Sequence, residues 1–371
     1  MRWDSMRLAG ESGSPPALFE RAAVARTFDT PGFRGITFHE VHAKTIISKV
    51  PEASRMSFRW TINPYRGCSH ACAYCFARNT HTYLDMDAGH DFDTQIVVKV
   101  NAIELLQREL AAPRWRGEHI AMGTNVDCYQ RAEGKYQLMP GIIRALTRAA
   151  NPFSILTKGT LVLRDIELLA EAAEVTDVGL NVSAGIVDKE LSRLVEPGTP
   201  APERRLAACA TFNERGLRCG VLMGPVLPFL TDSRGQLNQA VRDIAAAGAA
   251  HVSPIVLHLR PGAREWFLAW LQRSYPDLVP AYAQLYGSRA YAPASYQRKI
   301  AEQVTELASK YGVGRASPAR ARRLPQTGSR LAGPGAAGRA ASAGRAASAG
   351  GTDSPASTVP PEGSETQLTL L

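Results

Sequence analysis

The fold of this chain is decided by the stretch Asn63-Pro64-Tyr65-Arg66-Gly67-Cys68-Ser69-His70-Ala71-Cys72-Ala73-Tyr74-Cys75-Phe76-Ala77-Arg78. An apolar run at residues 58–62 comes directly before it, so we expect a buried strand followed by a loop. The three closely spaced thiolates of the loop can bind three irons of one cubane cluster and leave the fourth iron without a protein ligand. A cluster with such an open iron can bind a small molecule as well as transfer electrons.

The cysteine spacing has a second interpretation, because structural zinc sites also use close cysteine pairs together with histidine. His70 lies inside the loop, whereas the other cysteines, Cys128, Cys209 and Cys219, form no second close pair. A disulfide framework is disfavoured, because the first 20 residues lack a signal-peptide core and a chain of this size does not need covalent staples. The spacing therefore favours an iron–sulfur cluster, with zinc as the alternative.

The composition of the 371 residues is typical of a globular protein, with 45% hydrophobic and 21% charged residues. There is no run of about 18 apolar residues, so we expect no membrane span. Six cysteines in a chain of this length fit a reducing compartment. We therefore expect a cytoplasmic protein.

The net charge of +9 is unevenly distributed along the chain. Residues 315–371 are rich in Ala, Gly, Ser and Arg and carry seven arginines against three acidic residues, a net charge of +4. We expect this tail to be disordered, and likewise the polar N-terminal residues 1–35, which leaves residues 36–314 as the folded domain. The basic excess permits a nucleic-acid partner without requiring one.

Strand and helix patterns alternate along this domain. Apolar runs predict strands, and amphipathic stretches predict helices between them. The expected strands are residues 95–100, 119–124, 152–158, 177–184, 218–227 and 251–259, with a strand or hairpin at 36–50. The expected helices are residues 103–111, 139–150, 165–174, 189–195, 203–215, 236–247, 265–273 and 297–311. This alternation predicts an α/β fold with a parallel sheet, either an open doubly wound sheet or an incomplete barrel.

The pattern Cys-x3-Cys-x2-Cys with an aromatic residue before the last cysteine resembles the radical S-adenosylmethionine (radical SAM) superfamily. The wider string, from Asn63 to Arg78, resembles its branch related to spore photoproduct lyase. The resemblance implies a partial (β/α)6 TIM-like barrel with residues 58–62 as its first strand. It also implies that Cys68, Cys72 and Cys75 hold a [4Fe–4S] cluster. S-adenosylmethionine would bind the open iron, and an electron from a flavodoxin- or ferredoxin-like donor would cleave it to a 5′-deoxyadenosyl radical.

The resemblance also suggests residues that contact the cofactor. Tyr74 precedes the last cysteine, at a position close to the adenine in relatives, and Phe76 follows it as a cofactor contact or a core residue. Gly123, Thr124 and Asp127 follow an expected strand, at the position of the family's glycine-rich segment. A glycine there permits close backbone approach to a ligand. Asp127 could accept a hydrogen bond from the cofactor ammonium, act on substrate or cap a helix.

Polar residues at later strand ends complete the candidate site. Lys158 and Ser183 end the expected strands at 152–158 and 177–184, and functional side chains of βα barrels gather at such ends. Lys158 and Arg193 are candidates for the carboxylate of S-adenosylmethionine, with a solvated surface charge as the alternative. Residues 220–228 resemble the family's fifth-strand segment, which packs beside adenine. Cys128 is a candidate hydrogen donor, as spore photoproduct lyase uses a cysteine outside the cluster, or a small buried cysteine.

These observations lead to one main functional hypothesis and one alternative. The main hypothesis is a radical SAM enzyme, lyase-like, acting on nucleic acid in the manner of DNA repair. Modification of RNA, protein or a metabolite stays open, because the family fixes how the radical is made and not its target. The alternative is a non-catalytic iron–sulfur electron-transfer or zinc-binding protein. The oligomeric state is left open.

Overall fold

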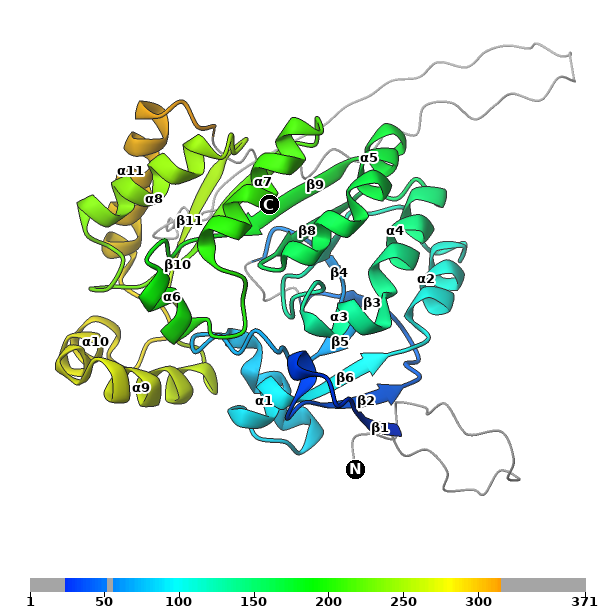
Figure 1. The fold of residues 1–371 in the computed structure, drawn as a ribbon, viewed down its shortest axis with the longest axis horizontal. Helices are drawn as coiled ribbons and strands as arrows, with labels where there is room; N and C mark the ends of the chain where they lie inside the picture. The colour runs from blue at the N-terminus through cyan, green and yellow to red at the C-terminus, as the bar shows by residue number, and fades with distance from the viewer. Residues whose placement is uncertain (1–23, 52–55, 315–371) are drawn as a thin grey trace, which may run out of the picture.

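The computed structural model of the chain describes residues 24–51 and 56–314 (Figure 1). The predicted disordered tail and residues 1–23 lie outside the described residues. Residues 24–35, predicted to be disordered, instead contain β1 (Val24–Thr27), which pairs antiparallel with β2 (Thr37–Val41). Phe28 and Phe33 contact Phe38, with ring centroids 5.4 and 5.3 Å away. The ordered chain therefore begins before residue 36, because these aromatic rings bury one another.

The larger of two sheets has seven strands in the order β11-β10-β9-β8-β7-β4-β3. Its strands are β3 (Ile47–Lys49), β4 (Trp60–Ile62), β7 (Ile120–Met122), β8 (Phe153–Thr157), β9 (Val178–Ser183), β10 (Cys219–Val226) and β11 (Val252–Val256). The last six are parallel to their neighbours, and β3 is antiparallel to β4 at one edge. The prediction of a parallel α/β sheet that starts at residues 58–62 is confirmed. Because the six strands run in one direction, their carboxyl ends meet at one edge of the sheet.

Helices pack around this sheet, as Figure 1 shows. They are α2 (Ala102–Leu110), α3 (Arg131–Tyr136), α4 (Leu138–Arg148), α5 (Ile166–Val175), α6 (Lys189–Val195), α7 (Pro202–Glu214), α8 (Arg234–Ala246) and α11 (Ala294–Lys310). Two further helices, α9 (Ala263–Ser274) and α10 (Val279–Tyr286), lie away from this sheet. All eight predicted helices are present, whereas α3 and α10 were not predicted. Among the described helices, none combines the length and apolar character that a bilayer crossing requires.

The smaller sheet, in the order β1-β2-β6-β5, holds the start of the cysteine loop. β5 (Tyr65–Arg66) pairs antiparallel with β6 (Gln95–Lys99), which follows the short helix α1 (His90–Thr94). The strand predicted at residues 95–100 therefore exists, but it belongs to this second sheet. The segment at residues 36–50 forms β2 and β3, which lie in different sheets and so are not a hairpin.

A second apolar cluster covers the outer side of the cysteine loop. α9 and α10 lie beside α6 in Figure 1, away from the large sheet. The cluster joins Cys72 and Tyr74 to Trp270 and Tyr282. The loop is thus enclosed between this cluster and the large sheet.

Gly123, directly after β7, has a close backbone contact that excludes any side chain. Its φ is +74°, and a Cβ atom there would lie 1.8 Å from the carbonyl oxygen of Leu156. Gly248, after α8, has a similar φ of +67° with nothing within 4 Å of an added Cβ. The two glycines therefore differ in packing and share the same backbone conformation.

We predict that Gly123→Ala lowers the free energy of unfolding by at least about 2 kcal/mol more than Gly248→Ala does. The control should cost only the left-handed strain of about 1–2 kcal/mol. Urea unfolding followed by circular dichroism measures both variants. Equal losses would contradict a tight contact between β7 and β8.

Candidate functional site

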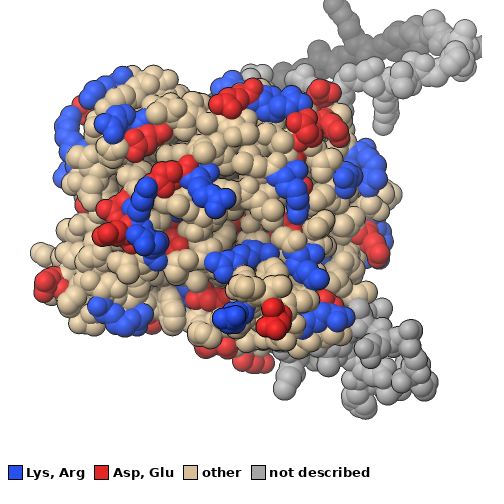
Figure 2. Space-filling view, viewed as in Figure 1, with Lys and Arg blue, Asp and Glu red and all other residues tan. Residues whose placement is uncertain are grey.

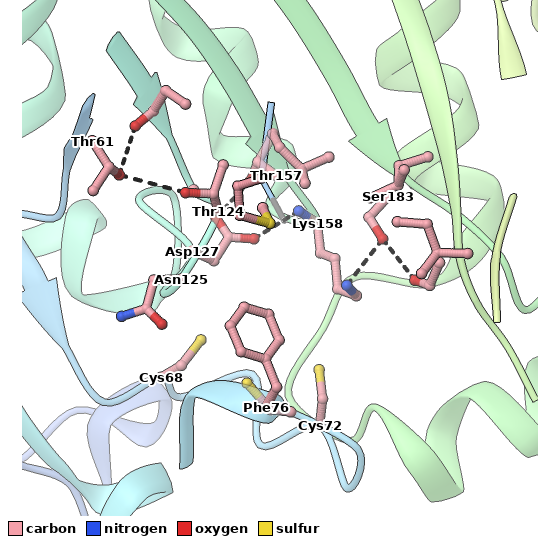
Figure 3. A pocket seen from close by; sticks show the side chains of 18 of the residues that line it. Thr61, Cys68, Cys72, Phe76, Thr124, Asn125, Asp127, Thr157, Lys158 and Ser183 are labelled. Carbon is pink, nitrogen blue, oxygen red and sulfur yellow. Dashed lines mark hydrogen bonds between the residues drawn. The ribbon is translucent and has the colours of Figure 1, made fainter. Parts of the chain in front are cut away.

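A pocket of about 410 Å³ lies at the carboxyl ends of the six parallel strands, facing the cysteine loop (Figure 3). Each strand contributes to its wall. The strand residues include Thr61, Ala121, Ser154, Ser183, Leu222 and Ile255, from β4, β7, β8, β9, β10 and β11. The side of β4 to β9 is largely polar and the side of β10 and β11 is apolar, so the pocket suits a ligand with both kinds of surface.

All three cysteines of the loop line this pocket. Figure 3 shows the side chains of Cys68 and Cys72 pointing toward the strand ends that carry Asp127 and Lys158. Burial raises the pKa of each thiol, in the case of Cys72 to about 12. Such thiols keep their protons until a metal displaces them, because thiolate is the form that binds metal. The donor set fits a cluster with three cysteine ligands.

Within the described residues, no three His, Cys, Asp or Glu side chains are grouped as ligands of one metal ion. A cubane cluster does not need that grouping, because each thiolate binds a different iron.

Arg78 holds the loop from inside the protein and is fully buried. Its Nε and Nη2 atoms donate to the carbonyl oxygen of Cys72 at 3.2 and 3.0 Å. Nη2 also pairs with the Asp93 carboxylate at 2.9 Å, and the guanidinium lies 5.2 Å from the Phe92 ring centroid and 4.7 Å from that of Trp266. Burial raises the pKa of Asp93 to about 6, although Arg78 acts in the opposite direction.

The segment between α6 and α7 holds the loop from the other side. The amide of Ala73 donates to Val195 O at 2.9 Å. Tyr74 donates its hydroxyl to the carboxylate of Glu196, which forms a fully buried ion pair with Arg205. Burial alone would raise the pKa of Glu196, but the nearby cations Arg205 and Lys158 hold it below its usual value. Tyr74 is therefore fixed beside Cys72 and Cys75.

Asp127 connects the loop to the end of β8. Its carboxylate accepts hydrogen bonds from the Thr157 hydroxyl at 2.6 Å and the Lys158 amide at 2.7 Å, and it lies 3.4 Å from His70 Nδ1. Burial acts to raise its pKa, but His70 and these hydrogen bonds lower it to about 2. Asp127 is not the cap of α3, since Gln130 occupies that position. The carboxylate lines the pocket and also ties its two walls together.

Lys158 presents its ammonium group to the pocket. Its Nζ donates to Ser183 Oγ at 3.0 Å and lies 5.7 Å from the ring centroid of Tyr74. Ser183 in turn donates to Gly224 O at 3.0 Å. No carboxylate of the described chain forms an ion pair with Lys158 in this arrangement, so the group can receive an anion.

Most of the predicted site residues meet in this pocket. They are Cys68, Cys72, Tyr74, Cys75, Phe76, Gly123, Thr124, Asp127, Lys158 and Ser183. Two predicted residues do not. Arg193 is exposed on α6, because the buried face of that helix carries Leu191, Ser192 and Val195. Cys128 is only 1% exposed and belongs to the main hydrophobic core, so the structure places it outside the pocket wall.

Two residues that were not predicted, His258 and Arg260, line the pocket beyond the end of β11. The rule that functional side chains follow parallel strands could have found them, had it been applied to the last strand. The Glu196–Arg205 pair was also missed. It has no local signal, because the two residues meet only when α6 packs against α7.

Thiols and strand ends around one enclosed pocket define a cofactor-binding α/β enzyme. The family model for the radical SAM superfamily matches residues 62–237. Uncharacterized proteins of Mycobacterium tuberculosis and Mycobacterium bovis are 51% identical to this chain over 316 residues, which cover 84% of it and 93% of each relative. The chain belongs to the radical SAM superfamily.

Solved structures of spore photoproduct lyase have a similar fold. The enzyme complexed with dinucleoside spore photoproduct aligns with a TM-score of 0.54 and 15% identity, over 74% of this chain and 79% of that one. A mutant of it with bound AdoMet and the same dinucleoside also gives 0.54, with 14% identity over 70% and 76%. At 14–15% sequence identity, this similarity shows a shared fold and nothing beyond it. The cofactors of the superfamily are a [4Fe–4S] cluster and S-adenosylmethionine, and the donor set described above fits the cluster.

The low pKa of Asp127 predicts a specific loss of stability in acid. Its pKa in the folded protein is lower than in the unfolded chain, so the ionised carboxylate stabilises the fold at neutral pH. That contribution, on the order of 2 kcal/mol, should be lost as the pH falls from about 4 to about 2. In Asp127→Asn this part of the pH dependence should be absent.

The measurement is urea unfolding of the cluster-free protein between about pH 5 and about pH 2. Glu167→Gln is the control, because Glu167 is an exposed carboxylate paired with Arg215, and this variant should keep the dependence. An unchanged pH profile in Asp127→Asn would contradict the assigned role.

Proposed function

We propose that this protein cleaves S-adenosylmethionine reductively at a [4Fe–4S] cluster bound by Cys68, Cys72 and Cys75, and uses the 5′-deoxyadenosyl radical on a substrate in the same pocket. One observation carries this proposal: the three loop cysteines, of which Cys68 and Cys72 are buried and Cys75 half-buried, and the ends of six parallel strands line the same partly enclosed pocket. The six strands then form the partial (β/α)6 barrel of the family.

Different residues of the chain bind different parts of S-adenosylmethionine. Lys158 binds its carboxylate, because the ammonium faces the pocket and is oriented by its hydrogen bond to Ser183. Gly123 and Thr124, which line the pocket at the end of β7, supply backbone groups to the cofactor. Tyr74 and the apolar wall of β10 and β11, with Leu222, Ile255 and Leu257, pack against the adenine.

The cluster, when bound, supplies the electron that cleaves the sulfonium, and the chain controls what the radical can meet. Apolar side chains of β10 and β11 exclude water from the cofactor's side of the pocket. Arg78 and the Glu196–Arg205 pair keep the cysteine loop in one position. An external electron donor of the flavodoxin or ferredoxin kind completes the reaction in the cytoplasm.

The leading substrate class is nucleic acid, in a lyase-like reaction of the DNA-repair kind. The support is the fold shared with spore photoproduct lyase and the basic net charge of +9. On the face in Figure 2, Lys and Arg are mixed with Asp and Glu and do not form one wide basic surface. On this face a polynucleotide would therefore be held by local contacts.

Anaerobic reconstitution tests the radical generator. The wild-type protein should bind about four irons and four sulfides. With S-adenosylmethionine and a strong reductant it should form 5′-deoxyadenosine, whereas Cys72→Ala should form none above background. Cys209→Ala is the matched control, because Cys209 is a buried cysteine of the main core and should leave product formation intact. One zinc per chain, or a loaded cluster without product, would contradict the proposal.

Nucleic-acid binding should depend strongly on salt. Phosphate contacts release counterions, so affinity for duplex or single-stranded DNA should fall roughly tenfold or more between about 50 and about 200 mM salt. Fluorescence anisotropy of a labelled oligonucleotide measures this with the reconstituted enzyme. Absent or salt-insensitive binding would exclude a polynucleotide substrate and leave the radical generator in place.

A further inference from the structure

Arg260 lies at the far end of the pocket wall, after β11. Its guanidinium packs over two aromatic rings, with the centroid of Phe76 at 5.6 Å and that of Tyr291 at 5.9 Å. One nitrogen, Nη2, donates to the Tyr291 hydroxyl at 2.7 Å. These contacts fix the plane of the guanidinium and leave most of its five N–H donors available.

The charge of Arg260 is not neutralised by any residue that the structure describes. Among residues 24–51 and 56–314, no acidic side chain forms an ion pair with it. Asp127 is the one carboxylate of the described pocket wall. Its oxygens already accept hydrogen bonds from Thr157 and the Lys158 amide and contact His70. A cation that faces a partly enclosed pocket without a counterion favours an anionic ligand.

The backbone around Arg260 is held firmly on both sides. His258 forms a β-bridge with Tyr291, and the amide of Leu259 donates to Ala290 O at 2.6 Å. The carbonyl oxygen of Arg260 accepts from the amide of Arg264 at 2.9 Å, where α9 begins. A side chain on such a support is ordered before the ligand arrives, which reduces the entropy lost on binding.

His258 lies next to Arg260 and also lines the pocket. Its ring centroid is 5.4 Å from that of Phe76 and 5.6 Å from that of Tyr291. Its Nδ1 atom is buried without a hydrogen-bond partner in the part of the chain that the structure describes. Burial, reinforced by Arg260, lowers the pKa of His258 to about 4, so the imidazole is neutral near pH 7 and serves as a polar contact.

Lys158 and Arg260 stand at the ends of different strands. Lys158 follows β8 and Arg260 follows β11, with β9 and β10 between these two strands. If Lys158 binds the carboxylate of S-adenosylmethionine, Arg260 is left for a different anion.

We propose that Arg260, oriented by Phe76 and Tyr291 and flanked by His258, forms an oxyanion subsite for a phosphate or carboxylate group of the substrate. This inference rests on the proposed function, in which the substrate reacts in the same pocket. It narrows the substrate class to molecules with an anionic group, held at the β11 end of the pocket. Arginine suits this role because its planar fork can bind two oxygens of a phosphate or carboxylate at once.

The test uses reconstituted enzyme with saturating S-adenosylmethionine, so that the cofactor's own anion site is filled. Equilibrium dialysis with labelled inorganic phosphate and, separately, labelled acetate measures anion binding. Arg260→Gln should weaken anion binding by at least about tenfold. The anion affinity of Arg260→Lys should lie between those of the wild type and Arg260→Gln, because lysine keeps the charge but lacks the planar guanidinium. Arg273→Gln, an exposed arginine of α9, is the control and should bind as the wild type does. The tighter-bound anion identifies the chemical group.

The affinity for S-adenosylmethionine and the rate of 5′-deoxyadenosine formation without substrate are measured on the same variants. Both should be unchanged in Arg260→Gln, which also shows that this variant folds. The inference is overturned if the wild type binds neither anion. It is also overturned if Arg260→Gln lowers the affinity for S-adenosylmethionine and leaves the affinity for the anion unchanged. Failure of the proposed function looks different: anion binding depends on Arg260, but the loaded wild-type enzyme forms no 5′-deoxyadenosine.

Discussion

The buried guanidinium of Arg78 is the interaction on which the cysteine loop depends. A loop that presents three thiols to a pocket has few side chains left with which to hold itself in place. Arg78 solves this by binding the carbonyl oxygen of Cys72 from within the protein, while Asp93 balances its charge. Removing one partner of a buried ion pair typically costs about 3–5 kcal/mol, so loop and domain are stabilised together. The contacts of Arg78 with Cys72 and Asp93 offset the cost of burying its charge, and they also position the cysteine loop.

The charged side chains around the pocket differ in whether a partner of the chain lies beside them. On the cysteine side, Asp127 and Glu196 are each matched by a partner, His70 and Arg205. Lys158 and Arg260, two cations of the pocket wall with which no described carboxylate forms an ion pair, stand at different strand ends. The chain therefore offers two separate places for negative charge, which suits a reaction between a zwitterionic cofactor and a second, anionic molecule.

What the sequence predicts well is local, and what it misses depends on contacts between distant segments. The cysteine spacing and the apolar strand runs are each encoded within about ten residues, so the cysteine loop and most strands of the parallel sheet could be predicted. The exposure of Arg193 depends on which face of α6 packs inward, and the inward turn of Cys128 depends on the core around it. The position of Arg260 after the last strand is local, but its packing against Phe76 and Tyr291, far apart in the chain, could not be predicted.

The smaller sheet gives the N-terminal residues a protective role. β1 covers the outer edge of β2, and through β6 that sheet reaches β5, which leads into the cysteine loop. Without Val24–Thr27, β2 would expose a row of unpaired backbone groups, which is the kind of edge at which chains join one another into aggregates. A shortened chain that begins at residue 36 would retain every cluster ligand and yet be prone to self-association.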